Sequence, residues 1–194
     1  MIKDFTGPGR SLMKGGEDLV LKRPLIIAVI LTMLISAVAL AWNAPKYDKI
    51  YPYLKNVPGW KAEKPVGQTM SLNGHTFSMV MKRYKKGTKE ATVVVGFGLF
   101  GPPAAYISQL GGLPSKFYQE TDEVIIKTTT YRGYRTFVQI FKKENRGFIG
   151  VVLSGGSDPS QIAYVALNFE NMSLGEAKAF LNNFDLKGIR SLIH

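Results

Sequence analysis

The segment from Leu25 to Trp42, LIIAVILTMLISAVALAW, contains no charged side chain over 18 residues, and it constrains this chain more than any other feature. As an α-helix it would extend over about 27 Å, close to the roughly 30 Å hydrocarbon core of a bilayer. Lys22, Arg23 and Pro24 precede it, and aromatic residues follow from Trp42 onward, as is typical of a membrane boundary. We therefore predict a transmembrane helix over residues 25–42.

A buried core helix and a cleaved signal peptide are the two other interpretations of this segment. No polar face interrupts the apolar run, which disfavours a core helix. Ala39-Leu40-Ala41 has the small residues of a signal-peptide cleavage site. However, the tail before the run has 24 residues and contains acidic side chains, and the run is longer than the usual h-region of about 7–15 residues. The sequence favours an uncleaved anchor.

Basic residues on the two sides of the segment indicate its orientation. Five Lys and Arg residues lie in the tail 1–24, and four lysines lie between residues 43 and 61. By the positive-inside rule, we expect the N-terminus in the cytoplasm and the segment in a bacterial inner membrane. The expected organisation is a cytoplasmic tail over 1–24, a transmembrane helix over 25–42, an extended linker rich in Pro and Tyr over 43–66, and a periplasmic domain over 67–194.

One face of the expected transmembrane helix carries Ala28, Thr32 and Ser36 at four-residue spacing. Small residues at this spacing allow a second helix to approach closely within a membrane. We expect these three residues to contact another membrane protein subunit.

Beyond the anchor, alternation of apolar and polar residues predicts a domain that is rich in strands. Prolines recur through the segment 43–66 and exclude a helix interior there, which favours an extended path. Glycine-containing turns separate the later apolar runs. The expected strands are 75–84, 91–97, 123–131, 134–142, 148–154 and 161–169, with a short helix over 102–110.

The last helix has the clearest local signal. Ser173 and Glu176 have the spacing of a capping box, in which each side chain accepts a hydrogen bond from the other residue's backbone amide. An apolar stripe follows at helical spacing, formed by Leu174, Ala177, Phe180, Leu181 and Phe184. The sum of these elements predicts an α+β fold, an antiparallel sheet with helices packed on one face.

The order of these elements resembles a known family. The hairpin FVQIFKKENRGFIGVVLS, the strand after it and the helix LGEAKAFLNNFDLKGI resemble the carboxyl half of small extracytoplasmic domains of the PsbP/Mog1-like type. The resemblance covers residues 67–192 as an order of elements and carries no diagnostic motif. It implies a non-catalytic subunit or assembly factor of a membrane protein complex, including photosynthetic complexes.

A glycine pattern, Gly96-x-Gly98-x-x-Gly101, follows an apolar run, with Glu120 and Glu123 about twenty residues further on. This spacing is found in dinucleotide-binding turns, which need a parallel βαβ unit. Hairpins follow here instead, so we interpret the glycines as a turn between a strand and a short helix. The apolar residues Phe97, Leu99 and Phe100 then become candidates for a core corner or for contact with a partner.

Basic residues recur in two other stretches. Lys82, Arg83, Lys85 and Lys86 form one group, and Arg132 with Arg135 belongs to the other. If their hairpins lie side by side, these residues form one basic face for anionic lipid headgroups or an acidic protein surface. The net charge of +11 and the isoelectric point of about 9.8 agree with an acidic partner, and the anchor disfavours nucleic acid.

The chain contains no cysteine and two histidines, His75 and His194. It therefore forms no disulfide and offers no thiol nucleophile or Cys-type metal site. Carboxylates such as Asp122, Glu123 and Asp158 lack the spacing of a cation site. We expect no cofactor, no metal and no catalysis.

These observations predict a non-catalytic accessory or structural subunit of a multi-protein membrane complex, for example in electron transport or photosynthesis. The outer domain would contact other membrane subunits. The alternative is a membrane-anchored module that binds a lipid or a small apolar ligand between its sheet and a helix.

Overall fold

The computed structural model of the chain describes residues 44–99, 102–155 and 161–193, which belong to one compact unit that spans Trp42–His194. The predicted transmembrane segment 25–42 lies outside these ranges. Within the ranges, no helix combines the length and the hydrophobicity that a membrane span requires.

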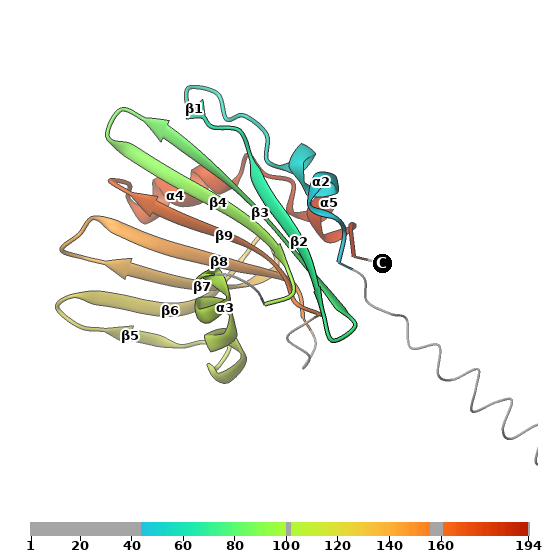
Figure 1. Cartoon of the computed structure of the whole chain (residues 1–194). Helices are drawn as coiled ribbons and strands as arrows, with labels where there is room; N and C mark the ends of the chain where they lie inside the picture. The colour runs from blue at the N-terminus through green and yellow to red at the C-terminus, as the bar shows by residue number, and fades with distance from the viewer. Residues whose placement is uncertain (1–43, 100–101, 156–160, 194) are drawn as a thin grey trace, which may run out of the picture. The chain divides into compact units, whose positions relative to one another are not determined.

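Short helices and a large sheet make up the domain (Figure 1). The helical elements are α2 (Tyr47–Ile50), the 3-10 helix η1 (Tyr51–Tyr53), α3 (Pro102–Gly112), α4 (Leu174–Leu181) and α5 (Leu186–Arg190). The strands are β1 (Lys61–Ala62), β2 (Val66–Leu72), β3 (His75–Lys86), β4 (Lys89–Phe97), β5 (Tyr118–Glu120), β6 (Val124–Tyr131), β7 (Tyr134–Phe141), β8 (Arg146–Ser154) and β9 (Ala163–Glu170).

The nine strands form one sheet in the order β1-β3-β4-β9-β8-β7-β6-β5, with β2 paired to β3 beside β1. Every one of these pairs is antiparallel. The predicted antiparallel sheet domain with short helices is therefore confirmed. Strand β9 comes from the end of the chain and lies between β4 and β8, at the centre of the sheet.

Alternate residues of the strands pack into two apolar clusters, one on each face of the sheet. Val93 and Ile149 belong to the larger cluster, which α2, η1, α4 and α5 cover. Val94 and Phe148, one position away in β4 and β8, belong to the smaller cluster, which Ile107 of α3 covers. The prediction of helices on one face only is thus wrong, because α3 packs on the opposite face of the sheet (Figure 1). We call these the helical face and the α3 face.

The segment 44–60 differs from the extended linker that its prolines predict. Ala44, Ile50, Leu54 and Val57 are buried in the larger cluster, and the Trp60 ring packs on the edge of Phe180 with centroids 4.7 Å apart. The prolines are accommodated because the helical turns here are short, with Pro52 inside the first turn of η1. The domain therefore begins at residue 44 among the described residues, and not at residue 67.

Candidate functional site

Lys82 holds the segment 44–60 against the sheet instead of forming part of an exposed basic face. Its side chain lies on the helical face with 6% of its surface exposed, and its Nζ donates to the Leu54 carbonyl oxygen at 2.8 Å and to Asn56 Oδ1 at 2.7 Å. Burial lowers the pKa of this ammonium group. Two residues on, the Tyr84 hydroxyl donates to the Lys55 carbonyl oxygen at 2.8 Å. The prediction of Lys82 as a surface contact is corrected accordingly.

The remaining members of the predicted basic face do not meet. Arg83 and Lys85 lie on β3, whereas Arg135 lies on β7, and three strands separate β3 from β7. At about 4.8 Å per strand spacing, the two strands are roughly 19 Å apart. Arg132 lies in the β6–β7 turn, at the opposite end of the sheet from the β3–β4 turn, and donates to the Phe184 carbonyl oxygen. The sequence expectation assumed neighbouring hairpins, but β9 and β8 lie between them.

Packing explains the glycines that resemble a dinucleotide-binding turn. A Cβ at Gly96 would overlap the Tyr164 ring, and Gly98 adopts φ +79° beneath the Phe77 ring. Strand β4 pairs antiparallel with both of its neighbours, β3 and β9, so it does not begin a parallel βαβ unit. Gly101 lies outside the described residues.

The predicted partner contacts divide into three groups. Phe97 is fully buried in the larger cluster, so it is a core residue and is not available at the surface. Leu99 is half-buried and packs against the smaller cluster. Phe100 and the three residues of the predicted transmembrane segment, Ala28, Thr32 and Ser36, lie outside the described residues. Leu99 alone is both described and partly accessible for the contact that the sequence suggested.

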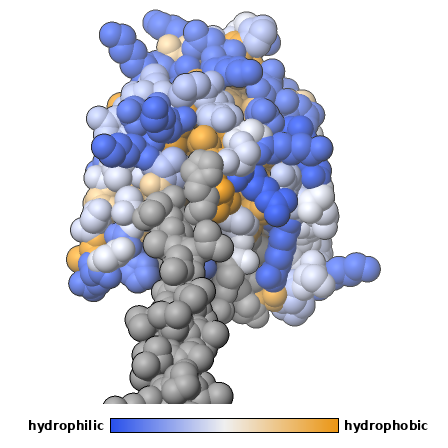
Figure 2. Space-filling model, turned by 90° about the vertical axis from the view of Figure 1, so that its right-hand side faces the viewer, coloured by the Kyte–Doolittle hydropathy of each residue, from blue (hydrophilic) through white to orange (hydrophobic). Residues whose placement is uncertain are grey.

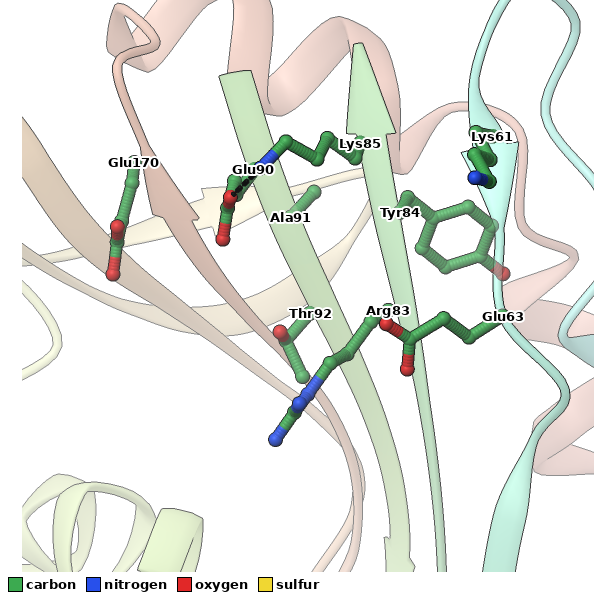
Figure 3. Close-up of a pocket in the computed structure, with 9 residues that line it drawn as sticks. All are labelled: Lys61, Glu63, Arg83, Tyr84, Lys85, Glu90, Ala91, Thr92 and Glu170. Atoms are coloured by element: carbon green, nitrogen blue, oxygen red, sulfur yellow. Dashed lines mark hydrogen bonds and ion pairs between the residues drawn. The ribbon is translucent and has the colours of Figure 1, made fainter. Parts of the chain in front are cut away.

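A polar pocket of about 440 Å³ lies on the α3 face, at the end of the sheet that α3 leaves uncovered (Figure 3). Its charged lining consists of three cations and three carboxylates: Lys61, Arg83, Lys85, Glu63, Glu90 and Glu170. The strand register produces this grouping, because Glu90 lies opposite Lys85 on β3 and opposite Glu170 on β9. The pocket is therefore balanced in charge.

Lys85 and Glu90 form an ion pair at 2.6 Å, which lowers the pKa of Glu90 and raises that of Lys85. Figure 3 shows Arg83 extended past Thr92, away from this pair. Ligand pockets usually have an apolar lining with a few polar groups, whereas this one is lined mainly by ionised side chains. In the described part of the chain, no three His, Cys, Asp or Glu side chains are placed to hold a metal ion. The arrangement of these side chains does not indicate a particular reaction in this pocket.

The helical face carries a second charged region, formed by Lys46 and Lys49 at α2 and by Lys187 and Arg190 of α5. We call these four exposed residues the basic helical surface; they outnumber the two exposed carboxylates of the same helices, Asp48 of α2 and Asp185 at the N-cap of α5. The two helices are close because Gly188 of α5 packs against Tyr53 of η1, directly after α2. None of the four cations forms an ion pair with a carboxylate of the described ranges. Figure 2 views the side of the molecule on which α2, α5 and β2 lie, and hydrophilic side chains cover most of it.

No protein-family model, curated relative or solved structure matches the chain. Sequence reasoning missed the basic helical surface and strand β2. Asn73-Gly74 is a strong hairpin signal that would have located β2, and both residues have positive φ in the β2–β3 turn.

Proposed function

We propose that this chain is a single-pass, membrane-anchored, non-catalytic accessory subunit of a membrane protein complex, such as one of electron transport or photosynthesis. The domain would lie in the periplasm of a bacterium, and the anchor would be the segment 25–42. The observation that carries the proposal is the burial of Ala44 in the larger cluster, two residues after the apolar segment ends.

This burial limits how far the domain can move from a membrane. In the sequence, only residue 43 separates the end of the apolar segment at residue 42 from the buried Ala44. The hydrogen bonds of Lys82 and Tyr84 to residues 54–56 secure the same segment to the sheet. If the segment 25–42 is inserted in a bilayer, we expect the domain to stay close to the bilayer surface. Such a position suits a subunit that is fixed within a larger complex.

The basic helical surface supports a position next to anionic lipid headgroups. Lys46 lies two residues from Ala44, and Lys187 and Arg190 extend the positive charge across α5. Each Lys or Arg near an anionic leaflet contributes about 1 kcal/mol of attraction. We propose that the helical face is directed toward the membrane and that the α3 face, with its charge-balanced pocket, is directed away from it.

The alternative, a module that binds a lipid or small apolar ligand between sheet and helices, has less support. Ile50, Leu54, Phe180 and Phe184 fill that layer, and the rings of Tyr84 and Phe180 are in edge contact at 5.2 Å. A ligand there would have to displace packed core side chains.

Two measurements on the full chain in native membranes test the proposal. Mild detergent extraction, a native gel and mass spectrometry should recover the chain together with other membrane proteins. A chain that runs alone as a monomer would contradict the accessory role. Because the protein has no cysteine, single spin labels can report orientation without background.

A label at Lys187→Cys should be relaxed strongly by a paramagnetic lipid headgroup, whereas a label at Thr92→Cys on the opposite face should not. Both positions lie in the described domain, and Thr92→Cys serves as the matched control. Equal relaxation of the two labels would contradict the proposed orientation.

A further inference from the structure

Strand β2 is an edge strand whose outer side is free of backbone partners among the described residues. It pairs with β3 over its full length from Val66 to Leu72, and no other backbone–backbone hydrogen bond to it occurs within those ranges. The Tyr47 amide donates to the Thr69 hydroxyl at 2.9 Å, from α2 on the helical face. A free edge of this length is a template for pairing with another strand, so proteins usually protect it with charge, proline or a bulge. The seven residues VGQTMSL contain no charged side chain and no proline.

The rest of the sheet boundary is largely protected. The preceding stretch 61–65 contains Lys61, Glu63, Lys64 and Pro65, and its short strand β1 pairs with β3 at only two positions. At the other end of the sheet, β5 has three residues, and its Glu120 is held in an ion pair by Lys142. Strand β2 is thus the longest unprotected edge among the described residues, since β6 is left uncovered only over 129–131. The difference between β2 and the protected strands β1 and β5 indicates that another strand covers β2 when the protein is assembled.

The exposed apolar side chains of β2 are placed symmetrically. Val66 and Leu72 lie at the two ends of the strand, with 66% and 56% of their surface exposed, three residues on either side of Thr69. Both side chains project to the α3 face, because they lie opposite Met81 and His75 in the register with β3. If a second β2 pairs antiparallel about Thr69, Val66 of each copy lies directly opposite Leu72 of the other. The strand is therefore complementary to itself.

We propose that a second copy of this chain covers the edge, through antiparallel β2–β2 pairing centred on Thr69, so that two sheets join into one. The proposal rests on the proposed function in one respect, which is that both copies are anchored in the same membrane. The two-fold axis of an antiparallel strand pair is perpendicular to the sheet, so it keeps the helical faces of both copies on the same side. Both Ala44 residues, which lie on the helical face, then lead toward the same membrane.

Two copies of a basic domain repel each other, but strand β2 itself contains no charged residue and can approach a second β2 without this repulsion. Within the two β2 strands no like charges oppose each other, although each chain carries a net charge of +11. Helix α2, which lies beside Thr69, brings Asp48 as well as Lys46 close to the pair. One strand pair is smaller than a standard interface of about 1,600 Å². Confinement of two anchored copies to one bilayer raises their effective concentration and compensates for the small area.

Cysteine cross-linking in the full chain tests the register directly. Residues directly opposite in an antiparallel pair have Cα atoms about 4.5–5.5 Å apart, which a disulfide can bridge. The two copies of position 66 would be six residues apart along the strand pair, or about 20 Å, which is too far for a disulfide. Mild oxidation of membranes should therefore convert Val66→Cys/Leu72→Cys to a disulfide-linked dimer on a non-reducing gel.

Matched controls make the result specific. Val66→Cys alone and Leu72→Cys alone should remain monomeric, whereas co-expression of these two single variants should give the mixed dimer. Tyr118→Cys, at a similarly exposed aromatic residue of the β5 edge, should also remain monomeric. All these positions are exposed, so the substitutions leave the core unchanged.

Two results would overturn the pairing: a double variant that stays monomeric, or single variants that cross-link equally well. A cross-link to a protein of different size would show that another subunit covers β2 and would also overturn it. Alkaline carbonate extraction of the same membranes separates this test from that of the anchor. A chain released by carbonate contradicts the proposed function, whereas a retained chain without the dimer contradicts the β2 pairing alone.

Discussion

The Lys82 ammonium group donates a hydrogen bond of 2.8 Å to the carbonyl oxygen of Leu54, which lies 28 residues earlier in the chain. Lys82 Nζ also donates to Asn56 Oδ1 and lies 5.5 Å from the centre of the Tyr84 ring. A buried cation is tolerated here because carbonyl oxygens and an aromatic face replace the water that it loses. This contact joins the segment 44–60 to strand β3 of the sheet.

Lys82→Met should destabilise the domain by about 1–3 kcal/mol, because the Leu54 carbonyl oxygen would remain buried without its donor. Lys86→Met is the matched control: Lys86 lies on the same strand and the same face but is exposed, so its change should stay within about 0.5 kcal/mol. Urea unfolding of residues 43–194 measures both, with the fluorescence of Trp60 as the reporter. Equal effects of the two substitutions would show that the Lys82 contact does not stabilise the fold.

Gly98→Ala should cost more than Gly74→Ala, although both glycines have φ +79°. At Gly74 the added Cβ meets nothing within 4 Å, so the cost is the backbone strain alone, about 1–2 kcal/mol. At Gly98 the same Cβ also collides with the Phe77 ring, which adds about 1–3 kcal/mol of overpacking. Thermal or urea unfolding of the two variants gives the difference. A Gly98→Ala variant that is no less stable than Gly74→Ala would contradict the packing explanation of the glycine pattern.

Glu176 should make the stability of the domain depend on pH in the acid range. Hydrogen bonds from the Lys89 side chain and from Ser173 lower the pKa of its carboxyl group from 4.5 to about 2. Because the folded pKa lies below the unfolded one, the contribution is complete above pH 4.5 and is lost as the pH falls toward about 2. The stability advantage of the wild type over Glu176→Gln should therefore shrink across this window.

Urea midpoints at a series of pH values test this prediction. Glu63→Gln is the control, because Glu63 is an exposed carboxylate that forms no ion pair within the described ranges. Ser173→Ala should separately cost about 1 kcal/mol at neutral pH, as the loss of a helix N-cap does. A constant difference between wild type and Glu176→Gln from neutral pH down to the acid limit would contradict the assignment.

The basic helical surface should bind anionic lipid. Lys187→Gln/Arg190→Gln should weaken the binding of residues 43–194 to phosphatidylglycerol vesicles by about 2 kcal/mol, roughly 30-fold. Lys61→Gln/Arg83→Gln removes the same charge from the opposite face and should have a much smaller effect. Co-sedimentation at low and high salt measures this, since salt screens the attraction. If the two double variants behave alike, the binding follows net charge and not the proposed surface.

Local signals predicted those parts of this fold that depend on a few neighbouring residues. Ser173 and Glu176 form the predicted capping box, and α4 begins at Leu174, because the cap needs only one turn of chain. The alternation over 75–84 correctly predicted most of β3, since burial on a sheet alternates residue by residue. Strand β2 was missed because its side chains are mostly exposed and its apolar residues are few.

Only the tertiary structure decided which residues meet. Lys82 and Lys86 project from the same face of β3, but the segment around Leu54 covers the first and leaves the second in solvent. The two basic hairpins are separated because β9, from the end of the chain, inserts beside β4. Strand order follows from burying both faces of the whole sheet, which no local pattern encodes. The sequence by itself determined the apolar segment, the charge and the strand periodicity. The burial of Lys82, the position of β2 at an edge of the described sheet and the basic helical surface arose from contacts between distant residues.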